Sequence, residues 1–278
     1  MLPPTDNHIL PTIATVGDLT RKAGELTLTY FRKHISISDK GDDLGIVTEA
    51  DLASEKFLKN FIAESFPDHA ILAEESGLQL GANQQDPIWI IDPLDGTTNF
   101  SKGNPYYCVS VAVGIRTEKQ CSIERAAIHH PYTDTLYTAE KGKGTFLNGK
   151  PIRVSELSNL SQASFATGFA GNKRERLSYV LRTIELFQNR ILGMRINGAA
   201  ALDLCHTASG VFQGFFERNL SPWDLAAGSL ILSEAGAVVT NMEGHFFDCL
   251  NDRDICAANP ILHAQMLEII ALAGAWPK

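Results

Sequence analysis

Two aspartates lie three residues apart in the stretch 88–100, which reads Ile-Trp-Ile-Ile-Asp-Pro-Leu-Asp-Gly-Thr-Thr-Asn-Phe. The apolar residues 88–91 predict a buried strand with Asp92 at its end. Pro93 is expected to break the strand, and Asp95 with the following glycine to form a turn. Oxygen ligands are those that Mg²⁺ prefers. The pair therefore indicates a metal site, although Asp-Gly after a strand is also a common simple turn.

The residues that follow this turn are suited to start a helix. Thr97, Thr98 and Asn99 are residue types that cap helix N-termini. The free N–H groups of a helix start bind phosphate oxygens. A single short segment could thus supply both a cation site and a phosphate site.

Three segments of the chain resemble signatures of the inositol monophosphatase family. They are Asp-Pro-Leu-Asp-Gly-Thr-Thr-Asn at 92–99, Glu-Glu-Ser at 74–76 and Trp-Asp-Leu-Ala-Ala-Gly at 223–228. The spacing fits the family from 40 to 259, so the resemblance covers most of the chain but not the residues before about 13. It implies a phosphatase that cleaves phosphate monoesters with metal-activated water.

The resemblance also implies roles for individual residues. Two or three Mg²⁺ ions would be held by Glu74, Asp92, the Leu94 carbonyl, Asp95 and Asp224, with Asp92 bridging two of them. The residues implied in catalysis are Asp51, Glu74 and Thr97. Asp51 and Thr97 would orient or deprotonate the attacking water, and Glu74 would hold the ion that activates it. Without metal these carboxylates would repel one another, which would raise some of their pKa values.

Substrate contacts are implied as well. The amides of Gly96 and Thr97 would receive the phosphate, and the remaining contacts would come from Gly198, Ala199, Ala200, Glu217 and Asp224. In inositol phosphatases the acid matching Glu217 binds ring hydroxyls. Lys40 matches a family position near the third metal.

Each of these residues also has a purely structural interpretation. Glu74 and Glu75 could be a solvated pair after a strand, with Glu75 lying beside the ligands or playing no part. Asp51 and Asp224 could simply occupy first helical turns, which favour acids. By the same reasoning Glu217 could end a strand in solvent, glycine at 198 could permit close packing, and Lys40 could be solvated. The joint pattern favours the metal site.

Composition narrows the classes of function. The chain has 278 residues and a net charge of −8, which argues against a general nucleic-acid or anionic-membrane binder. Metal ions explain how an acidic protein would bind an anionic phosphate. The five cysteines form no CxxC pair, which is typical of reduced thiols in a cytoplasmic protein. No apolar run approaches a membrane span, and the N-terminus lacks the basic region of a signal peptide.

Hydropathy patterns divide the chain into two subregions, about 13–150 and 151–278, which we expect to form a single unit without a linker. Helices are predicted at 13–34, 49–66, 173–189, 198–210, 222–235 and from about 260, and strands at 46–48, 70–73, 88–91, 106–115, 123–128, 135–140, 144–147, 164–168, 191–196, 212–217, 237–240 and 255–258. The first subregion reads as helices on an antiparallel sheet, and the second as an α/β pattern. The His-His pair before Pro131 is predicted to lie in a turn. The resemblance implies a layered α-β-α-β-α sandwich of the inositol monophosphatase and fructose-1,6-bisphosphatase type, with the site where the halves meet.

Three functions stay open at this point. The leading hypothesis is an Mg²⁺-dependent, lithium-sensitive phosphatase acting on myo-inositol monophosphate, a small phosphorylated polyol, and the resemblance suggests a homodimer. The same chemistry could act on histidinol phosphate, fructose-1,6-bisphosphate or a 3′-phosphoadenosine nucleotide. A third alternative is a regulatory binding protein associated with transcription machinery, because some bacterial members of the family are linked with it.

Overall fold

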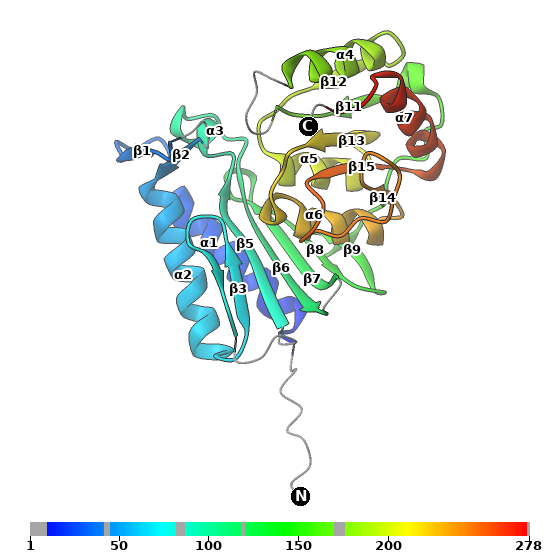
Figure 1. Cartoon of the computed structure of the whole chain (residues 1–278). Helices are drawn as coiled ribbons and strands as arrows, with labels where there is room; N and C mark the ends of the chain where they lie inside the picture. Colours follow the sequence, from blue (N-terminus) through cyan, green and yellow to red (C-terminus); the bar gives the residue numbers. More distant parts are fainter. Residues whose placement is uncertain (1–9, 42–44, 82–86, 118–119, 170–175, 277–278) are drawn as a thin grey trace, which may run out of the picture.

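The computed structural model describes residues 10–41, 45–81, 87–117, 120–169 and 176–276. Its elements stack in five layers (Figure 1). Helices α1 (Ile13–Leu28) and α2 (Glu49–Ser65) cover one face of a large sheet. Helices α5 (Ala200–Ala208) and α6 (Pro222–Glu234) lie between this sheet and a smaller one, and α4 (Leu177–Gln188) and α7 (Pro260–Leu272) cover the outside. This is the α-β-α-β-α sandwich that was expected.

The larger sheet contains eight of the described strands in the order β10-β9-β8-β7-β6-β5-β3-β4. Their bounds are β3 Ala70–Ala73, β4 Gly77–Gln79, β5 Pro87–Asp95, β6 Cys108–Arg116, β7 Cys121–His130, β8 Thr135–Glu140, β9 Gly144–Leu147 and β10 Lys150–Pro151. The β3–β5 pair is parallel and the other pairs are antiparallel. The predicted antiparallel sheet is therefore correct except for this one pair.

The smaller sheet is mixed and has the order β12-β11-β13-β15-β14. Its strands are β11 Ser164–Ala166, β12 Gly193–Arg195, β13 Gly214–Arg218, β14 Val238–Thr240 and β15 Asp254–Ala258. A short antiparallel pair, β1 (Ile37–Asp39) with β2 (Ile46–Thr48), stands apart from both sheets. The five-residue helix α3 (Thr97–Ser101) follows β5.

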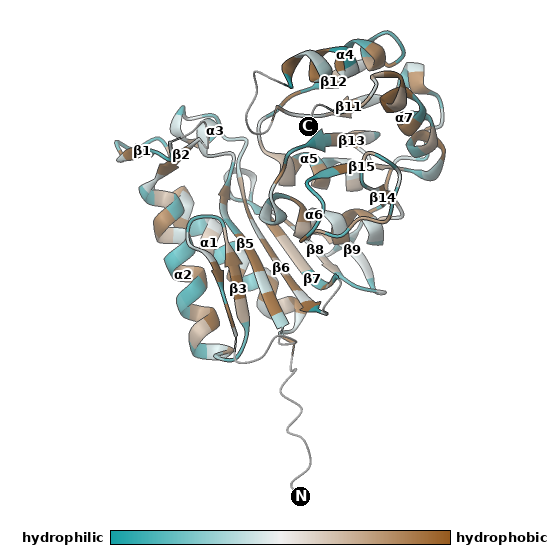
Figure 2. Ribbon diagram, in the orientation of Figure 1, coloured by the Kyte–Doolittle hydropathy of each residue, from teal (hydrophilic) through white to brown (hydrophobic). Residues whose placement is uncertain are grey.

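Side-chain alternation along β5 explains why helices cover both faces of the large sheet. Ile88 and Ile90 belong to the core cluster shared with α5 and α6, whereas Trp89 and Ile91 belong to the cluster under α1 and α2. All four side chains are at most 1% exposed, and each contributes roughly 1.5–3 kcal/mol by burial. The hydropathy colouring shows β5 as a largely apolar strand (Figure 2). We propose that the chain is one unit, because the first of these clusters contains residues of both halves.

Three element predictions need correction. Helix α1 ends at Leu28 rather than near 34, because the Thr29 backbone N–H caps it and a turn follows in which Arg32 has a φ of 58°. The two histidines before Pro131 end strand β7 instead of forming a turn. Strand β5 does not stop at Pro93 but continues to Asp95. The predicted start at 173 of the helix that corresponds to α4 lies outside the described residues.

Within the described part of the chain, no helix combines the length and apolar character that crossing a membrane requires. The five cysteines are free and buried, as expected.

Candidate functional site

A register irregularity in β5 brings the two aspartates of the central segment to the same face. Asp92 pairs with Ser110 of β6, and Asp95 pairs with Cys108. Three steps along β5 thus match two steps along β6, so β5 contains one extra residue, which makes a β-bulge. In a regular strand, residues three apart point to opposite faces. Pro93 lies inside the bulge, where its missing N–H costs no ladder hydrogen bond.

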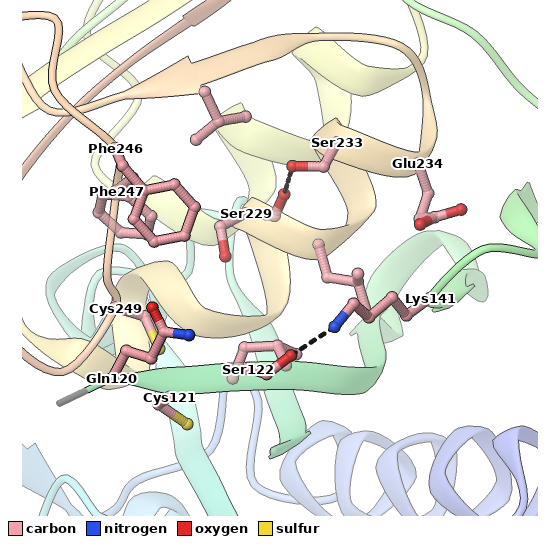
Figure 3. Close-up of a pocket in the computed structure, with 13 residues that line it drawn as sticks. Gln120, Cys121, Ser122, Lys141, Ser229, Ser233, Glu234, Phe246, Phe247 and Cys249 are labelled. Atoms are coloured by element: carbon pink, nitrogen blue, oxygen red, sulfur yellow. Dashed lines mark hydrogen bonds between the residues drawn. The ribbon is translucent and has the colours of Figure 1, made fainter. Parts of the chain in front are cut away.

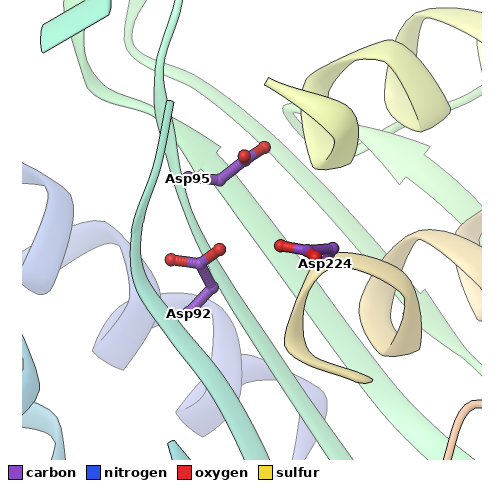
Figure 4. A group of neighbouring side chains, drawn as sticks. All are labelled: Asp92, Asp95 and Asp224. Carbon is purple, nitrogen blue, oxygen red and sulfur yellow. The ribbon is translucent and has the colours of Figure 1, made fainter. Parts of the chain in front are cut away.

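A third carboxylate, Asp224, joins the pair from the other half of the chain. It lies in the first turn of α6, where its Oδ2 accepts a 2.7 Å hydrogen bond from the Ser221 amide. One carboxylate oxygen from each of Asp92, Asp95 and Asp224 lies within 4.8 Å of the others. Figure 4 shows the three side chains pointing toward one another from β5 and from the start of α6. This is the geometry of a cation site built across the two halves.

Without a cation, the fold disfavours the ionised form of each of the three aspartates. Burial raises the pKa of Asp92 well above its usual range, and the charges of Glu74, Asp95 and Asp224 raise it further. Burial followed by the charge of Asp224 also raises the pKa of Asp95. Burial raises the pKa of Asp224 to about 7. The expected repulsion among these carboxylates is therefore present.

Glu74 and Glu75 form a second acidic corner with a cation of its own. The Lys40 ammonium donates to Glu74 Oε1 at 2.7 Å and to Glu75 Oε1 at 2.6 Å. The alternative of a solvated lysine is therefore wrong for Lys40. Burial, more than any other effect, raises the pKa of Glu75 to about 7. Glu74 also lies beside Asp92. The charge of Glu74 and a hydrogen bond between the two side chains both raise the pKa of Asp92.

Asp51 and Thr97 contact each other, as the proposed catalytic pair requires. The Thr97 hydroxyl lies 2.9 Å from Asp51 Oδ1 and 3.1 Å from the Leu94 carbonyl. Asp51 is fully buried, and its Oδ2 accepts a 2.9 Å bond from the Thr48 amide, which caps α2. Burial raises the pKa of Asp51. A raised pKa makes this carboxylate a stronger base than an exposed aspartate.

The turn that links β5 to α3 differs from the prediction. Thr97, Thr98 and Asn99 lie inside α3 rather than capping it, and the N-cap is Gly96 with a φ of 91°. A Cβ at this glycine would lie 3.0 Å from the Tyr106 carbonyl oxygen. Both the positive φ and the close approach of backbone therefore require glycine.

The start of α5 meets the site through a residue that the sequence did not single out. Gly198 and Ala199 precede the helix and Ala200 opens it. The amide that reaches the acidic group is that of Ala201, which donates to Asp95 Oδ2 at 2.8 Å. The sequence gives little signal for this contact, because every residue except proline has a backbone amide. The only indication is the predicted helix start near 198.

Glu217 is buried rather than solvent-exposed at the end of β13, with 6% exposure. A Cβ on Gly168 would lie 2.3 Å from Glu217 Oε1, so the carboxylate packs against that glycine. Glu217 is absent from the group of Asp92, Asp95 and Asp224.

The molecule also has a hollow of about 350 Å³ away from the acidic group. Figure 3 shows it between β7, α6 and the segment of Phe246 and Phe247. None of the residues singled out above is among its described lining residues. Its volume alone gives it no role in the chemistry of the carboxylates.

Comparison with known proteins places this geometry in a family. A family model described as "Inositol monophosphatase family" matches residues 10–274. The "Putative Nus factor SuhB" of Neisseria meningitidis serogroup B is 39% identical over 265 residues, covering 94% of this chain and 98% of that protein. "Inositol monophosphatase 3" of Solanum lycopersicum is also 39% identical, over 87% of this chain and 90% of its own length. The crystal structure of the extragenic suppressor protein suhB from Bartonella henselae aligns with a TM-score of 0.85 at 33% identity, covering 93% of this chain and 96% of that one.

The chain belongs to the inositol monophosphatase family. It is therefore a phosphatase of this superfamily, which acts on small phosphorylated substrates and depends on metal ions. The donor set fits a hard divalent cation, since it consists of carboxylate oxygens from two buried aspartates and one half-buried aspartate that lie within 4.8 Å of one another.

Proposed function

We propose that this inositol monophosphatase family member is an Mg²⁺-dependent phosphomonoesterase that converts myo-inositol monophosphate to inositol and phosphate. The observation that carries the proposal is the approach of Asp92, Asp95 and Asp224 to within 4.8 Å. The Thr97 hydroxyl that donates to Asp51 also lies 3.1 Å from the carbonyl of Leu94, the residue before Asp95. A carboxylate cluster and a hydroxyl–carboxylate pair are the two parts that metal-assisted hydrolysis needs.

The proposed ligands are oxygen donors from both halves: Glu74, Asp92, the Leu94 carbonyl, Asp95 and Asp224. Two or three Mg²⁺ ions there would supply positive charge for the phosphate and lower the pKa of bound water. In return they would remove the repulsion that raises the aspartate pKa values. An acidic protein could thereby admit an anionic substrate.

The residues of the chain itself move the proton and hold the phosphate in this proposal. A water molecule that donates to the Thr97 hydroxyl is coupled to Asp51, because the hydroxyl donates onward at 2.9 Å. Proton transfer along this path would leave the water nucleophilic toward phosphorus. The amides of Gly96 and Thr97, at the turn before α3, would bind the phosphate oxygens. This phosphate site is formed mainly by the backbone amides of a tight turn. Helix α3 has only five residues, so its dipole contributes little to phosphate binding.

Substrate choice is the finer part of the proposal. We assign ring-hydroxyl recognition to Glu217, with Gly198, Ala199, Ala200 and Asp224 as further contacts. This role follows the resemblance to inositol phosphatases, in which the acid matching Glu217 binds ring hydroxyls. Histidinol phosphate, fructose-1,6-bisphosphate and 3′-phosphoadenosine nucleotides are the alternative substrates. We also propose a homodimer in the cytoplasm.

A phosphate-release screen tests the proposal most directly. The purified protein is incubated with each of these phosphomonoesters, with Mg²⁺ or with a chelator. We expect release from inositol monophosphate that depends on Mg²⁺. Faster Mg²⁺-dependent release from another substrate would correct the substrate assignment, and equal release with a chelator would contradict the metal assignment.

Lithium offers a second test. The proposed ligands are hard oxygens that also accept a small monovalent ion. If Li⁺ occupies one position while phosphate is still bound, inhibition should strengthen as substrate rises. Initial rates are measured against substrate at several LiCl concentrations with matched NaCl. Identical effects of the two salts would exclude a selective lithium site.

A second candidate function rests on the relatives. Several are named Nus factor SuhB, at 38–39% identity. We propose a transcription-associated role as the alternative from another class. Affinity capture from a cell extract with the wild-type protein and with Asp95→Asn separates the two, since capture of transcription proteins by both variants would show binding independent of catalysis.

A further inference from the structure

A hydrogen-bond network of four residues crosses the boundary between the halves next to the acidic site. Its first member, Asn99 of α3, donates through Nδ2 to the carbonyls of Tyr106 and Asn197, both at 2.8 Å. Asn104 donates to Asn99 Oδ1 at 2.9 Å and so fixes the orientation of the amide. One side chain therefore ties the turn after β5 to the segment that leads into α5.

The second centre of the network is Asp203, which is 1% exposed in the first turn of α5. Its Oδ1 accepts a 2.6 Å bond from the Tyr106 hydroxyl and a 2.7 Å bond from Asn197 Nδ2. The Tyr106 hydroxyl also lies 3.0 Å from His206 Nδ1. Tyr106 and Asn197 thus contact Asn99 through their backbone carbonyls and Asp203 through their side chains, and the four residues form a closed ring.

The ring fixes the position of the helix start that holds Asp95. The Ala201 amide, two residues before Asp203, donates to Asp95 Oδ2. Packing leaves little room for adjustment, since a Cβ on Gly96 would lie 3.0 Å from the Tyr106 carbonyl oxygen and 3.2 Å from the Ala199 Cβ. A shift of α5 would therefore move the amide away from Asp95 and let its carboxylate rotate.

We propose that Asn99, Tyr106, Asn197 and Asp203 are positioning residues that aim Asp95 at the cation through the Ala201 amide. This inference rests on the proposed function, since it assumes that Asp95 binds Mg²⁺. None of the four side chains needs to touch the ion or the substrate. Loss of an outer partner of this kind typically lowers metal affinity by about 10–100-fold.

The experiment compares Tyr106→Phe with Tyr107→Phe by calorimetric titration of the metal-free protein with MgCl₂. Both variants lose one phenol oxygen and keep the ring. Tyr107 packs against Phe31 and Phe100 in another core cluster, so it serves as the matched control. We expect Tyr106→Phe to weaken Mg²⁺ binding about 10-fold with the melting temperature of the metal-free protein little changed, and Tyr107→Phe to leave Mg²⁺ binding unchanged.

A second pair of variants tests the acceptor. Asp203→Asn keeps an oxygen that can accept from Tyr106 and Asn197, whereas Asp203→Ala removes it. We expect Asp203→Asn to bind Mg²⁺ more tightly than Asp203→Ala and to retain its kcat at saturating Mg²⁺. A merely structural role would lower the melting temperature without this difference in affinity.

The outcomes separate the inference from the function. If the wild type binds Mg²⁺ and Tyr106→Phe binds it equally well, the positioning role is wrong and the proposed function stands. If the wild type shows no Mg²⁺ binding, both are wrong.

Discussion

The two acidic corners of the site differ in what offsets their charge. At the first corner Lys40 lies within 2.7 Å of both Glu74 and Glu75. At the second corner Asp92, Asp95 and Asp224 face one another, and burial and mutual repulsion raise the pKa of Asp92 and Asp95. A lysine of the chain thus offsets the charge of the first corner, whereas the aspartates of the second corner raise one another's pKa. The protein thus stores an unfavourable charge arrangement at the position where we expect catalysis.

The sharpest test of this difference is Asp95→Asn, which removes one charge from the second corner. We expect activity at limiting Mg²⁺ to fall by more than ~100-fold, beyond the usual loss for an outer-shell partner. The fold should persist, because an asparagine oxygen can still accept from the Ala201 amide. Phosphate release and a thermal melt on the same sample check both statements. Wild-type turnover at limiting Mg²⁺ would contradict the assignment of Asp95.

Glu217 is a buried acid outside both corners, so its loss should leave metal affinity unchanged. Removing a hydrogen-bond partner of a polyol costs on the order of 1–3 kcal/mol. We expect Glu217→Ala to lower kcat/KM for inositol monophosphate by roughly 10-fold or more, with a smaller effect on an aryl phosphate. Equal losses on the two substrates would remove Glu217 from substrate recognition, and Glu217→Gln serves as the conservative control.

Asp224→Asn tests the repulsion among the aspartates through the pH dependence of the free energy of unfolding. The pKa of Asp224 is about 7 in the fold against 3.8 for the free side chain. The folded state therefore binds this proton more tightly, and the associated stability is lost as pH rises from 3.8 to 7. We expect the metal-free variant to exceed the metal-free wild type in stability by about 1–2 kcal/mol at pH 7.5, after allowance for water around the half-buried carboxylate.

The comparison is made by thermal or urea denaturation in chelator at pH 7.5 and pH 5.5. The advantage of Asp224→Asn should shrink at pH 5.5, where the wild-type carboxyl is largely protonated. An advantage that is independent of pH would show that repulsion is not its source.

Lys40→Gln probes the first corner and should have the smallest effect. Glu74 and Glu75 would lose their cation, and we expect the metal-free protein to lose about 1 kcal/mol because the pair is only partly buried. Mg²⁺ should then raise the melting temperature more than in the wild type, since the ion would compensate for the lost ammonium. Lys143→Gln, with 67% of the lysine side chain exposed, is the matched control. Equal Mg²⁺ responses in both variants would show that Lys40 and the ion act independently.

The parts of the site that depend on neighbouring residues could be predicted from the sequence. Asp92 and Asp95 follow an apolar run, and Ser221 with Asp224 signals a helix start, so their elements were predictable from neighbouring residues. The five-layer architecture, in contrast, followed from the family resemblance and not from hydropathy.

The contacts that the sequence could not provide are those between distant segments. The Lys40 ion pairs join residues 34 and 35 positions apart, and the Ala201 amide reaches Asp95 across 106 positions. The course of β5 through Pro93 depends on its pairing with β6, which no local pattern reveals. Proline ends most strands, and only the partner strand allows this one to continue.

The bulge between Asp92 and Asp95 makes the number of residues in β5 part of the site. Leu94 is fully buried in the small core cluster that also contains Phe100 and Tyr107, so a smaller side chain there would weaken this packing in proportion to the volume removed. Straightening the strand without changing its length would have no intermediate effect, because residues three apart in a regular strand point to opposite faces and one carboxylate would turn away. A designer who transplants this pair of acids with the two residues between them must therefore also transplant the bulge, and with it the strand that lies opposite.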